Sequence, residues 1–349
     1  MMAGMKSRNL VSWALLAIFV VFHSCLLFSQ STPLDPAVRA TLDEGKKFEH
    51  DYQLGSALDS DRKALKLAKG KCAECLEAIA NLQLKMEAAK DAAASAAAWA
   101  AQASTPAEKA RAEYLQASAL LLQDKDKHSN ALLAQADQLL KRAATDDPAN
   151  PAIHLLDGHV LAMLGKDADA KNEFVACSTN PSATPAECLR AKNFANDVVL
   201  ARAEPAPAFK ITKTDGTVIS LDSLAGKVVL IDFWATWCPS CVKDVDYIQS
   251  IAEGVDKDRF VLLGVSDDSD EAKWKRYMAD NRMIGQQVRD TNHYLSDLFH
   301  VSAIPTYVIL DGNGTVQMRV TGTEGDLKGK VRSLLAKPAA SAPATQVGN

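Results

Sequence analysis

The sequence predicts a multidomain protein in which an N-terminal all-α array of helical hairpins precedes a C-terminal α/β domain. Residues 32–203 carry no strand signals and are dominated by Ala, Leu, Lys, Glu and Gln at helical spacing. Over residues 204–336, β-rich apolar runs alternate with helical segments, which is typical of a sheet with a crossover connection. With 349 residues, the chain is long enough for both parts.

The helical region, residues 32–203, is predicted to form hairpins. In Pro151–Pro181, Gly158 lies on a first helix, Gly165 makes a turn, and Ala170 and Phe174 lie on a second helix. This pattern is similar to a tetratricopeptide repeat (TPR), although the uneven spacing fits generic helical hairpins equally well. Either version stacks into a solenoid with a groove suited to binding a protein partner. The other expected helical segments are Ala37–Leu54, the pair within Cys75–Ser104, and Ala107–Gln123 with Ser129–Ala144.

The C-terminal domain follows a Pro/Ala-rich linker at residues 203–208 and precedes a tail, residues 337–349, that we expect to be disordered. Its first two strands flank the turn Asp215-Gly216. The expected strands are Phe209–Thr212, Thr217–Ser220, Lys227–Trp234, Phe260–Ser266, Thr306–Leu310 and Thr315–Val320. The expected helices are Pro239–Gly254, Asp270–Asn281, Thr291–Phe299 and Glu324–Ala336.

The first 31 residues are predicted to be a targeting segment. Lys6 and Arg8 precede an apolar run from Leu10 to Phe28, the arrangement of an export signal. The run is longer than a minimal signal core, so a cleaved signal peptide and an uncleaved inner-membrane anchor both remain open. Cys25 is interpreted as a small apolar residue of this segment rather than as a lipid-modified cysteine. We therefore expect a periplasmic or other extracytoplasmic location.

The overall composition gives no sign of a nucleic-acid partner. The formal net charge is −4, and 48% of the residues are apolar and 23% charged. Binding to nucleic acid requires Lys and Arg clustered on one face, and no such cluster stands out.

Cys238 and Cys241 form a Cys-x-x-Cys motif directly after a predicted buried strand, which indicates a redox dithiol. Cys238 should lie at the N-terminal end of the helix that begins near Pro239, where unpaired N–H groups and the helix dipole favour a thiolate. We expect Cys238 to be the exposed nucleophile and Cys241 the more buried resolving thiol. Because no second Cys/His pair stands at metal spacing, we expect neither a metal nor a cofactor.

Residues 205–336 resemble the TlpA/ResA-like thioredoxins. The stretch Phe233-Trp234-Ala235-Thr236-Trp237-Cys238-Pro239-Ser240-Cys241 is similar to their active-site signature, and Ile304-Pro305-Thr306 to their cis-proline loop. The resemblance implies a thioredoxin fold, a thiol–disulfide oxidoreductase activity and a cis Ile304–Pro305 bond. It also implies that substrates contact Trp237, Pro239, Ile304, Pro305 and Thr306.

The same resemblance implies roles for two acidic residues. Asp232 matches the buried acid of thioredoxins, where burial would raise the pKa and allow proton exchange with Cys241. Asp244 stands where the TlpA/ResA-like branch usually has Glu, so its reach is shorter. Asp246 replaces the proline that usually follows. Peroxidase chemistry is disfavoured because Ala235 stands where a peroxidatic site needs Thr.

Two functions are compared. The first is an exported reductase that acts on cysteine-containing exported proteins, receives electrons from a membrane donor, and recruits partners through the helical array. By resemblance, its processes would be cytochrome c maturation and cell redox homeostasis. The buried acid Asp232 and the lack of His between the cysteines favour reduction, although the direction of exchange stays open. The alternative is a TPR-type binding scaffold with a non-catalytic thioredoxin fold.

Four further cysteines are predicted to form structural disulfides. Cys72 and Cys75 open a helix but follow no buried strand, so a structural bond is favoured over a second redox site. Cys177 and Cys188 bracket a Pro-containing turn and are expected to join two helices.

Overall fold

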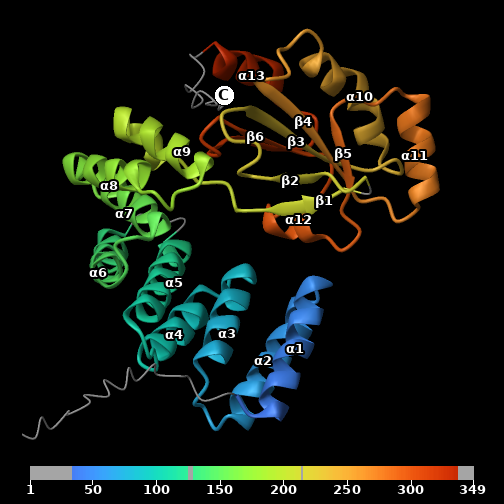
Figure 1. Ribbon diagram of the computed structural model, residues 1–349. Helices are drawn as coiled ribbons and strands as arrows, with labels where there is room; N and C mark the ends of the chain where they lie inside the picture. Colours follow the sequence, from blue (N-terminus) through green and yellow to red (C-terminus); the bar gives the residue numbers. More distant parts are fainter. Residues whose placement is uncertain (1–33, 125–128, 214, 337–349) are drawn as a thin grey trace, which may run out of the picture. The chain divides into compact units, whose positions relative to one another are not determined.

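The computed structural model describes residues 34–124, 129–213 and 215–336 (Figure 1). The predicted targeting segment and the predicted disordered tail lie outside these residues. Within them, no helix is long and apolar enough to cross a membrane.

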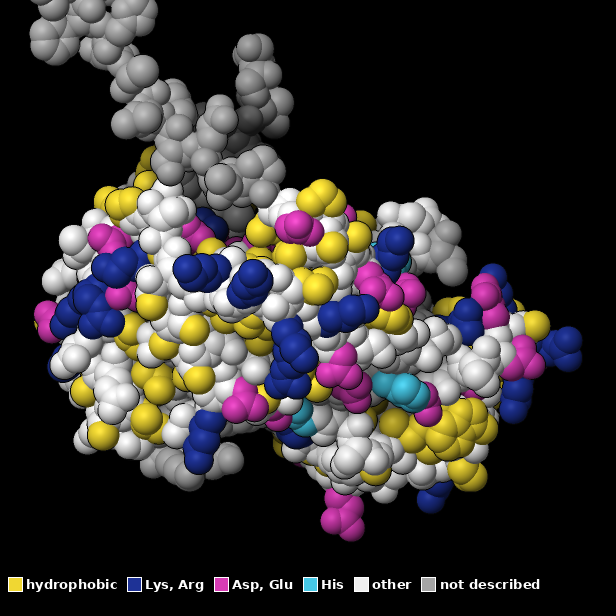
Figure 2. All heavy atoms as spheres, turned by 90° about the horizontal axis from the view of Figure 1, so that it is seen from below, with side chains coloured by type: hydrophobic (Ala, Val, Ile, Leu, Met, Phe, Trp, Pro, Cys, Tyr) yellow, Lys and Arg dark blue, Asp and Glu magenta, His cyan; other side chains and the backbone are white. Residues whose placement is uncertain are grey.

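The N-terminal region is helical, and helices that follow one another in the sequence pack side by side (Figure 1). Many of the ion pairs in this region join different helices, such as Arg39 with Glu74 and Arg142 with Glu113. On the face shown in Figure 2, acidic and basic side chains are interspersed. The helices are α1 (Pro36–His50), α2 (Leu54–Leu67), α3 (Ala73–Lys85), α4 (Ala89–Ala100), α5 (Pro106–Asp124), α6 (Asn130–Asp146), α7 (Pro151–Met163), α8 (Asp167–Thr179), α9 (Pro185–Asn196) and the 3-10 helix η1 (Val198–Arg202).

The pair α7 and α8 shows why this sequence forms a hairpin. The Asn150 side chain accepts a hydrogen bond from Ala152 N and caps α7. Gly165, at φ +72°, makes the turn into α8. A Cβ atom on Gly158 would lie 2.4 Å from the Phe174 ring, so only glycine permits this close approach of the two helices. Gly165 therefore makes the turn that the sequence predicts, and Gly158 and Phe174 lie on the two helices expected for them.

The first predicted helix is wrong in its length. The chain does not continue as one helix from Ala37 to Leu54, because Tyr52 adopts a left-handed backbone conformation at φ 55°. It forms α1 and then α2, and α2 has no counterpart in the sequence analysis. The buried positions of α2 include Ser60 and Asp61, which interrupt the apolar stripe by which helices are recognised.

The C-terminal domain is built on a sheet with strand order β5-β4-β3-β6-β7. Strand β3 runs parallel to β4 and antiparallel to β6, and a separate hairpin, β1-β2, precedes it. The strands are β1 (Lys210–Thr212), β2 (Val218–Ser220), β3 (Val228–Trp234), β4 (Phe260–Ser266), β5 (Gln286–Arg289), β6 (Thr306–Leu310) and β7 (Val316–Thr321). The helices are α10 (Pro239–Ala252), α11 (Glu271–Asp280), α12 (Tyr294–Leu298) and α13 (Leu327–Leu335).

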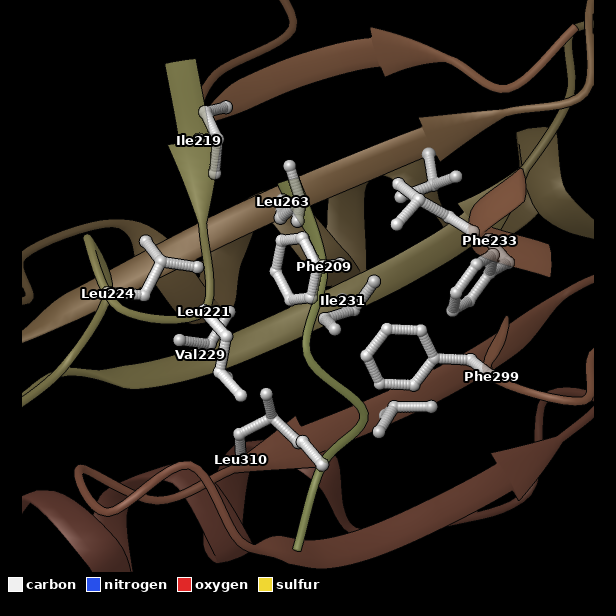
Figure 3. Packing of buried hydrophobic residues seen from close by; sticks show 14 of the residues in the cluster. Phe209, Ile219, Leu221, Leu224, Val229, Ile231, Phe233, Leu263, Phe299 and Leu310 are labelled. Carbon is white, nitrogen blue, oxygen red and sulfur yellow. The ribbon is translucent and has the colours of Figure 1, made fainter. Parts of the chain in front are cut away.

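Every residue of β3 is buried because both faces of the sheet are covered. On one face Val229, Ile231 and Phe233 pack with Phe209 and Phe299 (Figure 3). On the other face the alternate residues of β3 pack against α10 and α13 through a second apolar cluster. The central strand therefore delivers its C-terminal end, and the cysteine motif that follows, from a rigid core.

The domain contains one strand, β5, that the sequence does not predict. Strand β5 lies at the edge of the sheet and has the largely polar sequence Gln-Gln-Val-Arg. The helix expected over Thr291–Phe299 is shorter in the structure, because His293 takes a left-handed conformation at φ 58° immediately before α12.

The cysteines of the helical region behave differently from one another. Cys72 and Cys75 are joined in a disulfide at the start of α3. Cys177 and Cys188 are free thiols, so the disulfide predicted between them is wrong for this structure. Cys177 packs into the apolar cluster of α7, α8 and α9, and this burial raises its pKa to about 12. A thiol with such a pKa stays protonated near neutral pH and is a poor nucleophile.

Candidate functional site

The Cys-x-x-Cys motif lies where β3 passes into α10. Cys238 is the N-cap residue of α10, and its Sγ accepts a hydrogen bond of 3.2 Å from the Cys241 main-chain N. Pro239 occupies the first turn of the helix, where no main-chain donor is needed. Cys238 and Cys241 are joined in a disulfide, so the structure describes the oxidised site.

Burial does not distinguish the two cysteines. Cys238 and Cys241 are each 4% exposed, which corrects the expectation that Cys238 would be the more exposed. Both pack with Trp234, Ala235 and Trp274 in one apolar cluster. In the oxidised site both sulfur atoms are therefore buried to the same extent. Whether a partner can reach them depends on the residues that surround the disulfide.

Trp237 and Pro239 supply the accessible surface beside the disulfide. The Trp237 side chain is 54% exposed, and Pro239 is exposed next to Cys238. An exposed aromatic ring offers a large apolar contact to a partner at small entropic cost. Both residues were predicted from the sequence to contact substrate, and their exposure is compatible with that role.

The loop before β6 approaches the disulfide. The Ile304–Pro305 peptide bond is cis, as the resemblance implied. The Ile304 carbonyl O lies 3.9 Å from Cys238 Sγ. Ile304 is half-buried, whereas Pro305 and Thr306 are buried, and the Thr306 hydroxyl donates to the Ala303 carbonyl. The loop thus brings the main chain around Ile304, rather than the Thr306 side chain, to the reacting sulfur.

Asp232 lies beneath α10 on β3. Alternation along the strand places it on the same face as Leu230 and Trp234, which belong to the clusters that contact α10 and the cysteines. Asp232 is 7% exposed, and its Oδ1 atom has no hydrogen-bond partner among the described residues. Burial, with a smaller contribution from the Asp244 charge, raises the pKa of Asp232 to about 7. A carboxyl group with this pKa can both accept and return a proton near neutral pH.

Two residues of the site were not found from the sequence. Tyr307, on β6, donates a hydrogen bond of 3.0 Å from its hydroxyl to Asp244 Oδ2. Asp268 follows β4 and accepts hydrogen bonds from the Thr236 main-chain N (2.9 Å), the Thr236 hydroxyl (2.6 Å) and the Ser266 hydroxyl (2.7 Å). Each residue had a signal in the sequence. Tyr307 carries a hydroxyl within the apolar strand Thr-Tyr-Val-Ile-Leu, and Asp268 belongs to a group of acids directly after a buried strand.

Part of the chain is similar to known proteins. Residues 203–319 match the AhpC/TSA family. The chain carries an AhpC/TSA thioredoxin-fold domain. The chain is 28% identical over 130 residues to the thiol-disulfide oxidoreductase ResA of Bacillus subtilis. The aligned stretch covers 37% of this chain and 73% of ResA. The chain is also 28% identical to the thioredoxin-like protein YneN of the same organism, over 36% of this chain and 75% of YneN.

A solved structure of a thiol:disulfide interchange protein from Chlorobium tepidum is 26% identical, with a TM-score of 0.35. The matched part covers 38% of this chain and 97% of the Chlorobium tepidum chain. The ResA relatives and the Cys238–Cys241 disulfide together make this domain an oxidoreductase of the thioredoxin-like type. The family match, residues 203–319, lies in the C-terminal part of the chain.

Proposed function

We propose that the protein is an exported thiol–disulfide oxidoreductase that exchanges disulfides with protein substrates through Cys238 and Cys241 and works as a reductase. The observation that carries this proposal is the disulfide at the N-cap of α10, 3.9 Å from the Ile304 carbonyl and beside the exposed Trp237. The main chain near Ile304 offers an edge for an extended client segment, and Trp237 offers an apolar contact.

Exchange proceeds in two steps from the reduced protein. The Cys238 thiolate attacks one sulfur of the client disulfide, and the other client sulfur leaves as a thiolate that takes up a proton. Cys241 then loses its proton to Asp232 and attacks Cys238 Sγ, which releases the second client sulfur. The client gains two electrons from the two cysteines, which form the disulfide seen in the structure. The two client thiolates take up two protons, balanced by the proton that Cys238 gave up on ionising and the Cys241 proton passed to Asp232.

Several features support the reducing direction and the exported location. Ser240 and Pro239 separate the cysteines, so no His is present there to stabilise a thiolate as in strongly oxidising relatives. Asp232 is poised to accept the Cys241 proton in the resolving step. The N-terminal apolar run supports export, with cysteine-containing exported proteins such as apocytochromes as clients and a membrane protein as electron donor.

Turnover of insulin disulfides tests the activity. We expect the wild type to reduce insulin with a dithiol as electron source, and Cys238→Ser to fall to the uncatalysed background. The matched control is Cys72→Ser, which breaks the other Cys-x-x-Cys disulfide and should retain the rate. A wild type without thiol-dependent turnover would favour the alternative, a TPR-type binding scaffold with a non-catalytic thioredoxin fold.

Trapping tests the assigned roles and the direction. In Cys241→Ser the resolving thiol is gone, so mixed disulfides between Cys238 and clients should accumulate on non-reducing gels and disappear in the Cys238→Ser/Cys241→Ser double variant. The potential of the Cys238–Cys241 couple, measured against glutathione, should lie in the range of reducing thioredoxins. A potential close to that of strong periplasmic oxidants would overturn the reductase assignment.

The helical region is proposed to be the module that binds protein partners. Stacked helical hairpins such as α7 and α8 present extended surfaces that suit this role. All the side chains assigned to chemistry lie outside it, between Asp232 and Tyr307, so the two functions can be separated experimentally.

A further inference from the structure

Three polar side chains meet on the buried side of the disulfide. Asp232 on β3 stands directly opposite Tyr307 on β6 in the antiparallel register. Asp244 lies on α10, three residues after Cys241 and therefore on the same helix face. The Tyr307 hydroxyl reaches across and donates to Asp244 Oδ2 at 3.0 Å. Strand, helix and strand thus each contribute one group to a single cluster.

The cluster is largely closed to solvent. Tyr307 is 2% exposed and Asp232 is 7% exposed, whereas Asp244 is half-buried at the surface of α10. Burial, with the Asp232 and Asp244 charges and the hydrogen bond to Asp244, raises the pKa of Tyr307 well above its ordinary value. The tyrosine therefore keeps its proton throughout the physiological range and acts only as a donor toward Asp244.

The ionisable groups around this cluster come from each element packed against it. From β3 and α10 they are Asp232, Asp244 and Tyr247, since Cys241 is held in the disulfide. On α13, Lys328 packs against α10, where its Nζ donates to the Ser250 hydroxyl and its main-chain N to the Tyr247 hydroxyl. On β4 the residue opposite Asp232 is Gly264, which carries no charge. The two carboxyl groups are thus the charges that act on each other here.

We propose that Tyr307 is a positioning residue of the exchange site: by donating to Asp244, it holds that negative charge beside Asp232 and so keeps Asp232 a strong enough base to take up the Cys241 proton. This inference rests on the proposed function. Without the Tyr307 hydroxyl, the half-buried Asp244 is free to turn toward solvent, which leaves Asp232 alone in the apolar core.

The inference is tested on the oxidised full-length protein by following the aspartate carboxyl carbons through a pH titration by NMR. The wild type should show the Asp232 step at about 7. In Tyr307→Phe and in Asp244→Asn this step should move to lower pH, because the neighbouring negative charge is turned away or removed. The double variant should titrate as Asp244→Asn does, because Tyr307 acts through Asp244.

The control variant is Tyr294→Phe, which removes a hydroxyl from a tyrosine that packs on the opposite face of the sheet and should leave the Asp232 step unchanged. An Asp232 step that stays in place in Tyr307→Phe would overturn the inference. A Tyr307→Phe shift that adds fully to that of Asp244→Asn would also overturn it, because Tyr307 would then act on Asp232 directly. If Tyr307→Phe folds poorly, Asp244→Asn tests the same contact, because Asp244 is only half-buried and its substitution disturbs the core less.

A kinetic measurement connects the cluster to exchange. In single-turnover resolution of a mixed disulfide on Cys238, the pH of half-maximal rate should fall in the same two variants. The rate at pH 7 should also fall, by about three- to tenfold, because Asp232 becomes a weaker base. A merely structural role for Tyr307 would leave this pH unchanged. If the protein shows no exchange at all, the proposed function fails, and the NMR titration still decides the role of Tyr307.

Discussion

Asp232 illustrates how a single side chain is costly to the fold and useful to the chemistry. The carboxyl group is buried, Oδ1 has no hydrogen-bond partner among the described residues, and burial raises the pKa to about 7. Ionising it in the core is unfavourable, because a buried charge without a compensating partner loses its hydration. A buried carboxyl group with a raised pKa is expected at a site where a proton has to be held and released near neutral pH.

We expect Asp232→Asn to be more stable than the wild type at alkaline pH. The folded-state pKa is raised above the unfolded value, so the carboxyl group favours the fold at low pH, and this contribution is lost as the pH rises from about 4 through about 7. The difference in free energy of unfolding should approach about 2–4 kcal/mol at pH 9 and become small near pH 4. Denaturant unfolding at both pH values measures it, and a difference that does not change with pH would contradict the raised pKa.

Asp157 provides a comparison outside the site. It is 1% exposed on α7, and burial raises its pKa to about 7 as well. Asp157→Asn should therefore stabilise the fold at alkaline pH in the same sense as Asp232→Asn, while leaving insulin turnover unchanged. Loss of turnover in Asp157→Asn would mean that the helical region takes part in the chemistry.

Among the elements, the loop between β3 and α10 depends on Asp268 for its shape. The Asp268 carboxylate holds Thr236 by its main-chain and side-chain donors, two residues before the nucleophile. Asp268→Ala removes these acceptors, and the resulting displacement of Cys238 should slow exchange by about ten- to hundredfold while the protein stays folded. Asp267→Ala, next to it but paired with His293 at the surface, is the matched control and should be nearly neutral.

The contact between α7 and α8 gives a second prediction for an element. Overpacking by Gly158→Ala should cost about 1–3 kcal/mol, more than the ~1 kcal/mol that alanine gains over glycine in a helix. Replacing Phe174 with Leu in the same chain should restore part of the loss. Gly55→Ala on α2 is the control, since a Cβ atom there meets nothing within 4 Å, and it should be neutral or stabilising. A Gly158→Ala variant more stable than the wild type would contradict this prediction, because α7 and α8 would then accommodate the added methyl group without a loss of stability.

The sequence predicts best the elements whose residues share one environment. Strands β4 and β6 have the bounds expected for them, because a continuous apolar run is the pattern of a buried strand. The edge strand β5 and helix α2 were missed because polar residues interrupt their patterns. The cysteine motif is local in sequence, whereas Tyr307 meets Asp244 across 63 residues and Asp268 meets Thr236 across 32, and such contacts depend on the register of the folded sheet.

At the scale of the whole molecule, the chemistry and the proposed partner binding occupy different stretches of the chain. A chain without residues 35–184 keeps every side chain of the site. It should reduce insulin within about threefold of the full rate, because insulin reaches the disulfide without a docking surface. The yield of clients trapped by Cys241→Ser should fall in the same truncated chain. An unchanged yield would contradict the binding role of the helical region.

The disulfide at the start of α3 has a consequence for how many reducing equivalents the molecule stores. Cys72 has the same N-cap geometry as Cys238, with its sulfur accepting from the main-chain N of the second cysteine. Together with the free Cys177 and Cys188, the described residues present two thiols when oxidised and six when fully reduced. The protein can thus carry two separate electron pairs. Thiol counting during stepwise reduction, repeated in Cys72→Ser, would assign each pair to its disulfide.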